Sequence, residues 1–572
     1  MIRIVTLPLW GSLKVYTWRL FFSDLIAGLV TALVAVPQVM AYAQLAGLPP
    51  ELGLYSAVVP LFCYACLGSS RTLVVGPAAL ICLLVSSSIQ SLAPESSQAY
   101  LVLSVNLALL TGIFLMMLSI LRLGSFANMI SQPVVTGFTS ASAVIIAVSQ
   151  LPVILGIIVS KGNSLQHTIV ELINNILLVN PVVILISLTS FVFIWVWNRY
   201  IPILTRRLHL PDILSQGLNK TASIVLLGLS IGLVTKLSLA NQYDLAIVGT
   251  IPNELPTLST HLIKLSYWPE LILPASSIAL LCFLTSISTG LSLTNKSQDK
   301  INPNQELLAL GAANVGAALT GSFALAASLS RSMINYSSGA MTQVSNLISA
   351  LVMLMSILLL TPYLANLPKA VLGTIVIFSV VPMMLIPNLR QCWQFNKGDG
   401  VCLFFTFFST LILGPEKGIW AGIICSVVLL VHRSSKPNVV EVGRAENGYF
   451  RNIQRTQVKT LDNTLFLRVD ENLFFANIQH IENYLFKSYK SRPDVKHIVI
   501  ICSSVSAIDE TALRRIENWI TALQKDGVIL HLSDVKGFLR DKLAYTNLIE
   551  QLKPGQLFYT ADDAMKHLEQ LP

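Results

Sequence analysis

The chain has 572 residues, of which 53% are hydrophobic and only 12% charged, and its mean hydropathy is +0.67. Soluble globular proteins carry about 25% charged residues, so this composition excludes an ordinary water-soluble protein. The formal net charge of +9 does not indicate nucleic-acid binding, because the Lys and Arg residues stand between apolar runs and do not gather on one basic face. We therefore expect no nucleic-acid partner.

Apolar runs follow one another from Asp24 to Val431, and many reach the ~20 residues that a helix needs to cross a bilayer. The sequence predicts a polytopic α-helical membrane protein with about fourteen spans, embedded in a lipid bilayer. The expected spans are 24–44, 52–68, 76–91, 100–121, 134–150, 178–197, 222–238, 271–294, 306–321, 328–338, 342–361, 369–386, 400–414 and 417–433.

The basic residues indicate how these spans are oriented. Loops that contain Arg122, Arg199 and Arg433 alternate with loops poor in Lys and Arg, such as residues 47–51 and 93–98. Since cytoplasmic loops are the positive ones, both termini are expected in the cytoplasm. The first residues show no removable signal peptide, and the compact termini are typical of a bacterial protein. We expect a multi-pass protein of the bacterial inner membrane.

Two of the expected spans are short and broken by small residues, one around Gly76 and Pro77 and the other between Ser328 and Arg331. Interrupted spans in corresponding places of two halves are typical of a transport site. A helix that begins at membrane depth presents unpaired backbone N–H groups, which attract an anion, and Pro77 suits a first helical turn. Kinked spans in a packed bundle explain the same pattern equally well.

Arg331 favours the transport site over the kink. A charged side chain at membrane depth costs about 2.5–3.5 kcal/mol even on the lenient insertion scale, so such residues are usually functional. Beside a helix N-terminus its charge would add to the helix dipole and form a site for an anion. The alternative is a structural arginine that satisfies a backbone carbonyl or extends to the interface.

After Arg433 the composition changes, which divides the chain into a transmembrane domain, 1–433, and a soluble α/β domain, 434–572. Residues 465–469, 497–502 and 528–533 are expected as strands, and residues 479–489, 509–527 and 561–571 as helices, with Gly527 ending the second helix.

The sequence contains no set of residues that indicates an enzyme. Cysteine spacing predicts neither a disulfide framework nor a zinc site, and a metal or redox role for the pair Cys63 and Cys66 is disfavoured inside an apolar helix. No nucleophile, base and orienting group come together, and no Gly-rich phosphate loop is present. We therefore expect no enzymatic activity, no metal and no cofactor.

Several motifs resemble the sulfate permease (SulP) family of anion transporters and exchangers. Residues 24–56, beginning DLIAGLVTALVAVPQVMAYAQ, are similar to the family's signature region. GSSRTLVVGPAA at 68–79 resembles the stretch leading into its third helix, and residues 302–335 resemble its ninth and tenth helices. In the soluble part, FFANIQHIENYL and SSVSAIDETALRRIENW resemble the STAS domain that these transporters carry.

The resemblance implies a seven-plus-seven inverted repeat, a homodimer, and a core domain that moves against a gate domain in an elevator-like manner. It also implies a site for a small anion between the third and tenth helices. The residues carried over to this site are Gln38, Tyr42, Ala78, Ala79, Leu329, Ser330 and Arg331. Without the resemblance, Gln38 and Tyr42 would be interpreted as interhelical contacts.

Thr285 departs from the family pattern, because many members carry Glu or Asp at this position in the eighth helix. A buried carboxylate there could couple transport to protons or sodium, and Thr285 cannot titrate. Thr289, one turn further, still offers a hydroxyl. We therefore hypothesise a net positive site that favours anion exchange or uncoupled anion movement.

The substrate and the function of the soluble domain stay open at this stage. Sulfate or a related oxyanion is the first choice, followed by bicarbonate, chloride and a dicarboxylate. An anion channel or a membrane sensor that signals through the STAS domain is the alternative function, and a nucleobase transporter fits Arg331 poorly. Thr511 lies where isolated STAS domains are phosphorylated, although Asp509 and Glu510 beside it also suit a helix cap.

Overall fold

The computed structural model describes residues 8–14, 16–92, 96–124, 131–157, 165–208, 218, 221–243, 245–249, 255, 257–297, 301–384 and 393–570. The chain forms two compact units, the first ending at Ser426 and the second beginning at Val427. The long helix α20, Pro415–Ser434, crosses this division, and the boundary predicted after Arg433 lies at its end.

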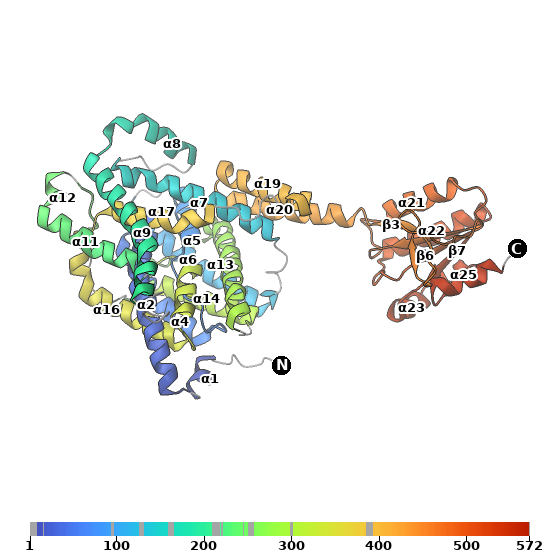
Figure 1. Cartoon of the computed structure of the whole chain (residues 1–572), viewed down its shortest axis with the longest axis horizontal. Helices are drawn as coiled ribbons and strands as arrows, with labels where there is room; N and C mark the ends of the chain where they lie inside the picture. The colour runs from blue at the N-terminus through green and yellow to red at the C-terminus, as the bar shows by residue number, and fades with distance from the viewer. Residues whose placement is uncertain are drawn as a thin grey trace. The chain divides into compact units, whose positions relative to one another are not determined.

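The first unit consists almost entirely of helices (Figure 1). Every predicted span overlaps a helix of the structure, and the two short broken spans correspond to α5 and α15. Besides α20, its helices are α1 Pro8–Lys14, α2 Trp18–Leu45, α3 Pro50–Tyr55, α4 Val59–Leu67, α5 Ala79–Gln90, α6 Ser97–Ile120, α7 Gln132–Leu155, α8 Leu165–Asn174, α9 Pro181–Arg207, α11 Ala222–Leu237, α12 Leu239–Gln242, α13 Trp268–Ser297, α14 Pro303–Leu319, α15 Leu329–Ser337, α16 Val344–Leu364, α17 Lys369–Met384 and α19 Lys397–Leu413.

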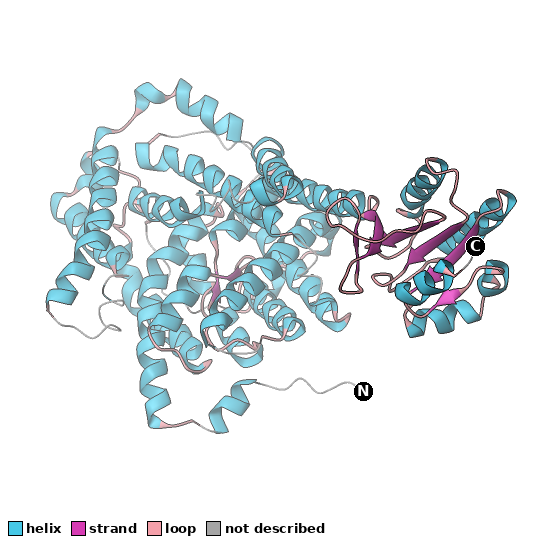
Figure 2. Ribbon diagram, turned by 45° about the vertical axis from the view of Figure 1, so that its right-hand side comes forward, coloured by secondary structure: helices cyan, strands magenta, loops and turns pink. Residues whose placement is uncertain are grey.

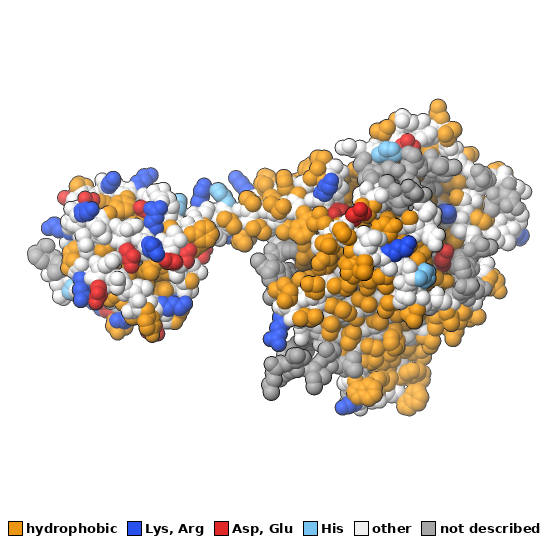
Figure 3. All heavy atoms as spheres, turned by 180° about the vertical axis from the view of Figure 1, so that it is seen from behind, with side chains coloured by type: hydrophobic (Ala, Val, Ile, Leu, Met, Phe, Trp, Pro, Cys, Tyr) orange, Lys and Arg blue, Asp and Glu red, His pale blue; other side chains and the backbone are white. Residues whose placement is uncertain are grey.

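Many of these helices suit a bilayer by length and composition. Within the described residues, eight helical segments are both long and apolar enough to span a membrane, and α5, α11 and α17 are shorter apolar helices. Hydrophobic side chains form a broad area over the middle of the helical unit on the face shown in Figure 3, which suits contact with lipid. The exact number of crossings stays a prediction.

Two short strands lie inside the helical unit, where they are enclosed by helices (Figure 2). Strand β1, Val75–Gly76, pairs antiparallel with β2, Ala326–Ala327, and all four residues are buried. Extended backbone inside a membrane protein must find its hydrogen bonds within the protein. The ladder meets this need by joining two segments about half the chain apart.

Buried amide side chains hold the segments next to this ladder. Asn314 of α14 donates from Nδ2 to the carbonyl of Leu325 at 3.1 Å and accepts from the Leu325 N–H at 3.0 Å. Asn346 of α16 donates from Nδ2 to the carbonyl of Leu73 at 2.8 Å. Because these side chains replace missing strand neighbours, they fix the backbone on both sides of the ladder.

A fully buried carboxylate, Glu306 of α14, anchors the loop that leads to β1. It accepts hydrogen bonds from the hydroxyl of Tyr64 at 2.8 Å, from the N–H and hydroxyl of Ser69 at 2.8 and 2.6 Å, and from the N–H of Ser70 at 3.0 Å. A buried carboxylate is tolerated when its oxygens are satisfied in this way. Glu306 therefore ties α14 to α4 and to the approach to the ladder.

The second unit is an α/β domain with a six-stranded mixed sheet in the order β4-β3-β5-β6-β7-β8. Strands β5 to β8 run parallel, and β3 pairs antiparallel with β4 and β5. The elements are β3 Val439–Arg444, β4 Phe450–Asn452, β5 Thr464–Val469, α21 Ile478–Lys490, β6 His497–Ile501, α22 Glu510–Lys525, β7 Ile529–Ser533, α23 Gly537–Ala544, α24 Leu548–Leu552, β8 Leu557–Phe558 and α25 Ala561–Glu569.

Alternating side chains along the strands cover both faces of the sheet with helices. Leu465 and Leu467 of β5 join the core formed with α21, α22, α23 and α24, whereas Phe466 joins the smaller core formed with α25. Successive strand residues point to opposite faces, so one strand supplies both cores. The three predicted strands and three predicted helices are all present, and β3, β4, β8, α23 and α24 were not predicted.

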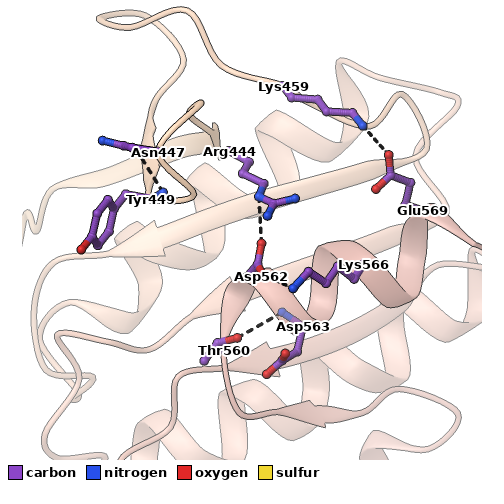
Figure 4. A network of polar contacts seen from close by, with 9 residues as sticks. All are labelled: Arg444, Asn447, Tyr449, Lys459, Thr560, Asp562, Asp563, Lys566 and Glu569. Carbon is purple, nitrogen blue, oxygen red and sulfur yellow. Dashed lines mark hydrogen bonds and ion pairs between the residues drawn. The ribbon is translucent and has the colours of Figure 1, made fainter.

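Ion pairs connect the β3–β4 hairpin region to α25 across the edge of this domain (Figure 4). Asp562 lies between Arg444 Nε at 2.8 Å and Lys566 Nζ at 2.7 Å, and Lys459 pairs with Glu569. These side chains are partly exposed, so each pair contributes little stability by itself. Together they fix the position of the last helix against the antiparallel end of the sheet.

Candidate functional site

The N-termini of α5 and α15 meet at the β1–β2 ladder. Ala78 and Ser328, the residues before each helix, have extended backbones, and neither of their side chains caps its helix. Because the strands are antiparallel and each leads directly into its helix, the helices run away from the ladder in opposite directions. Their first N–H groups and positive dipole ends therefore face the same region, which suits an anion.

Arg331 stands in the first turn of α15 and is only 1% exposed. Its Nη2 donates to the carbonyl of Pro77 at 2.7 Å. Gly76 makes this approach possible, since a Cβ at Gly76 would lie 3.1 Å from Nη2. No carboxylate among the described residues forms an ion pair with Arg331, so none of these residues compensates its positive charge.

This arrangement changes the interpretation of Pro77. The sequence placed Pro77 in the first turn of a helix, but α5 begins at Ala79 and Pro77 precedes the extended residue Ala78. Proline ends the strand here because it has no N–H to donate, and its carbonyl is free to accept from Arg331. The guanidinium thus bridges from α15 to the segment that leads into α5.

A chain of hydrogen bonds connects α2 to the site. Gln38 Nε2 donates to Tyr42 Oη at 3.2 Å and to Ser330 Oγ at 3.3 Å, and Tyr42 Oη donates to Ser379 Oγ at 3.2 Å. Ser379 in turn donates to a carbonyl of its own helix, α17. The structure therefore brings together Gln38, Tyr42 and Ser330, as predicted, and adds Ser379.

The predicted residues differ in how far they reach solvent. Leu329 is 54% exposed and Ser330 is exposed, whereas Ala79, Gln38 and Tyr42 are buried. The first two residues of α15 are therefore exposed, while Arg331 is buried. A ligand at the start of α15 would meet backbone N–H groups and the Ser330 hydroxyl first, with the Arg331 charge behind them.

Thr285 and Thr289 lie on α13, which packs behind the ladder. Thr285 Oγ1 donates to the carbonyl of Leu281 at 2.7 Å, one turn earlier in its own helix, and Thr289 is buried. Among the described residues, neither hydroxyl is hydrogen-bonded to Gln38 or Arg331. Instead Ser286 of the same helix supports the site, since its Oγ accepts from the N–H of Ala327 in β2 at 3.1 Å.

In the second unit, Asp509 caps α22. Its Oδ1 accepts from the N–H of Ala512 at 2.8 Å, and its Oδ2 accepts from the N–H of Phe475 at 2.8 Å. Both predicted features, an Asp cap and an acidic first turn, are present. Thr511 is exposed in this turn.

With this geometry described, comparisons with known proteins decide the family. Residues 21–406 match the sulfate permease family, and residues 455–564 match the STAS domain. The chain belongs to the sulfate permease family. The resemblance inferred from the motifs is thereby confirmed, and the first unit is the membrane transporter domain of this family with a STAS domain following it.

Relatives and solved structures agree with this assignment. A protein of Arabidopsis thaliana named "Probable sulfate transporter 4.2" is 31% identical over 98% of this chain and 83% of its own length. The murine Solute Carrier 26 member A9 anion transporter in the inward-facing state matches with a TM-score of 0.90 at 23% identity, covering 99% and 94% of the two chains. The transmembrane domain of the cyanobacterial bicarbonate transporter BicA matches with a TM-score of 0.60 at 24% identity, covering 72% and 98%. The predicted fold class is confirmed.

Proposed function

We propose that this sulfate permease family protein is a secondary transporter that moves small anions by elevator-like alternating access. The observation that carries the proposal is Arg331, a buried arginine without a carboxylate partner among the described residues, beside two uncapped helix N-termini. A buried positive charge of this kind is costly, and such residues are therefore usually functional. An anion at the start of α15 would compensate the charge.

The proposed site uses backbone and side-chain donors together. The N–H groups at the starts of α5 and α15, around Ala78, Ala79, Leu329 and Ser330, would bind the anion's oxygens directly. Arg331 would act mainly through its charge, because Pro77 already occupies Nη2. Gln38 would orient Ser330, to which its amide donates.

Sulfate or a related oxyanion is the first proposed substrate, with bicarbonate, chloride and a dicarboxylate next. The name of the Arabidopsis relative supports sulfate, and the name of BicA supports bicarbonate. Backbone N–H donors can bind each of these anions, because they interact with negative charge and do not select one molecular shape.

We propose that transport is exchange or uncoupled movement, independent of sodium through α13. Thr285 carries no charge, and its hydroxyl hydrogen is used within the helix. A single hydroxyl is a poor site for a sodium ion, which prefers several oxygen ligands.

The cellular setting is proposed with the same function. A seven-plus-seven inverted repeat in the bacterial inner membrane, with both termini in the cytoplasm, agrees with the apolar helices and the loop charges. A homodimer with a core and a gate domain in each copy completes the proposal.

The test is uptake of radiolabelled sulfate, bicarbonate, chloride and succinate into proteoliposomes, with and without sodium and pH gradients. The variants are Arg331→Ala, Arg331→Lys, which keeps the charge, and Arg199→Ala as an exposed control. Saturable, sodium-independent uptake that Arg331→Ala abolishes and Arg199→Ala preserves would support the proposal. Uptake unaffected by Arg331→Ala would place the site elsewhere, and large unitary currents would favour a channel.

A further inference from the structure

A small cavity lies beside Arg331 and the β1 strand of the ladder. It has a volume of about 10 Å³ and is lined by residues of α2, α4, β1, α15 and α16. Most of its wall is aliphatic, and its polar lining residues are Thr31, Ser349 and Arg331 itself. A cavity needs about 10–15 Å³ to hold one water molecule, so this one has room for a water and not for a polyatomic anion.

Two buried polar atoms of the lining residues have no protein partner among the residues that the structure describes. These are Thr31 Oγ1 and Arg331 Nη1, and both side chains are 1% exposed. A buried donor or acceptor without a partner is costly, and the cost is greater for a charged group. One donor and one acceptor on residues that line the same small cavity are the two partners that a bridging water requires.

Ser349, the third polar residue that lines the cavity, can supply another hydrogen-bond acceptor for this water. Ser349 Oγ donates to the carbonyl of Gly28 at 2.8 Å, which leaves its oxygen able to accept. Arg331 Nη1 would donate to the water oxygen, and the water would donate to Thr31 Oγ1 and Ser349 Oγ. Arg331 Nη1 and Thr31 Oγ1 then each have a hydrogen-bond partner.

We propose that an ordered water in this cavity bridges Thr31 and Arg331, and that Thr31 is a positioning residue for the anion site. Thr31 lies two helical turns before Gln38 on α2, so one helix supports the site through both residues. The Arg331 guanidinium is then held at both ends, by the Pro77 carbonyl at Nη2 and by the water at Nη1. Its charge stays fixed behind the helix N-termini.

The direct test is a structure of the full chain at a resolution that shows ordered waters, for the wild type and for Thr31→Val. The wild type is expected to show one density peak within hydrogen-bond distance of both Thr31 Oγ1 and Arg331 Nη1. Thr31→Val, which has the same shape without the hydroxyl, is expected to lose this peak. Absence of the peak in the wild type, or a peak that strengthens when bromide replaces chloride, would overturn the proposal.

The functional test uses sulfate uptake into proteoliposomes and rests on the proposed function. Thr31→Val is expected to raise the KM for sulfate about fivefold with little change in kcat, because it loosens Arg331 without removing it. Thr31→Ser restores the hydroxyl and is expected to behave like the wild type. Ser142→Ala removes another buried hydroxyl, remote from the cavity on α7, and serves as the control.

The two proposals fail in different ways. If Arg331→Ala abolishes uptake while Thr31→Val and Thr31→Ser both match the wild type, the positioning role of Thr31 is wrong and the anion site stands. If Arg331→Ala has no effect on uptake, the proposed function is wrong. The presence of the water is still tested by the density in the cavity. If Thr31→Val and Thr31→Ser both reduce the amount of folded protein, a role for the hydroxyl is also contradicted.

Discussion

Tyr42 Oη donates a hydrogen bond to Ser379 Oγ at 3.2 Å, which joins α2 to α17 beside the candidate site. Gln38 donates to the same phenol oxygen, so the orientation of the Gln38 amide depends on where Ser379 holds the phenol. Ser379, which the motifs did not indicate, therefore fixes the positions of Tyr42 and Gln38, which they did indicate.

Replacing Ser379 with Ala should therefore weaken anion binding. The lost hydrogen bond frees the Tyr42 phenol, and we expect the KM for the transported anion to rise about fivefold. Tyr42→Phe should have an effect at least as large, since it also removes the acceptor of Gln38, and the double variant should be little worse than Tyr42→Phe alone, because the bond to Ser379 is already lost. Thr374→Val is the control on α17, since its hydroxyl bonds only within its own helix. Additive effects in the double variant would contradict this coupling.

Glu306→Gln should destabilise the transporter domain. The Gln amide nitrogen cannot accept from Tyr64, Ser69 or Ser70, which leaves at least one buried donor unpaired at a cost of about 1–3 kcal/mol. We expect the midpoint of thermal unfolding of the purified protein to fall by several degrees, and Tyr64→Phe to cause a smaller decrease. An unchanged midpoint for Glu306→Gln would show that these hydrogen bonds contribute no net stability.

The STAS domain contains a buried histidine pair. Its free energy of unfolding should decrease as the pH falls through the range in which these histidines titrate. His531 Nδ1 accepts from the N–H of Gln556 at 3.1 Å, so its proton lies on Nε2 and is donated to His497 Nδ1 at 3.1 Å. Burial, together with the charges of His497 and His567, lowers the pKa of His531 to about 4. Burial and the charge of Lys496 lower the pKa of His497 in the same direction.

The sign of the pH effect follows from these directions. The unfolded chain binds protons at about pH 6.5 and the folded domain does not, so stability is complete above pH 6.5 and falls between pH 6.5 and 4. For His531 the loss amounts to about 3 kcal/mol. Hydrogen exchange of β7 in the full chain, corrected for intrinsic rates, should show it, and the exposed His480→Gln variant should leave the profile unchanged. Exchange that is constant from pH 7 to 5 would contradict the lowered pKa values of His531 and His497.

Asp509 should matter for the STAS domain more than its neighbour Thr511. Asp509→Ala removes the cap of α22 and the partner of the Phe475 N–H, and we expect a loss of about 1–2 kcal/mol. Asp509→Asn should retain most of the stability, and Thr511→Ala should be neutral. Hydrogen exchange of α22 measures each effect.

Phosphorylation of Thr511 is a separate proposal, which its exposed position permits. A phosphate at the start of α22 would face the positive end of the helix dipole but also the carboxylates of Asp509 and Glu510. Intact mass and peptide mapping of protein from native cells would show the modification, and unmodified peptides under all growth conditions would exclude it.

Much of the fold could be predicted because long apolar runs and alternating strands have local patterns. The breaks around Gly76 and Ser328 indicated α5 and α15, since short runs ended by small residues cannot span a bilayer. Ser379 could not be found in this way, because a serine in an apolar helix shows no pattern and its partner Tyr42 is 337 residues away. Strands β4 and β8 lie at the two edges of the sheet, where short segments with mixed polarity give weak signals.

The β1–β2 ladder also bears on how selectivity behaves during transport. Its hydrogen bonds join one half-helix from each half of the sequence, so the spacing between the starts of α5 and α15 cannot widen unless the Val75 and Ala327 pairing breaks. Under the proposed mechanism, an anion would therefore meet the same donors whether it arrives from the cytoplasm or from outside. The two sides of the membrane would differ in the anion's access to the site and in ion concentration. The order of affinities among anions would be the same from both sides.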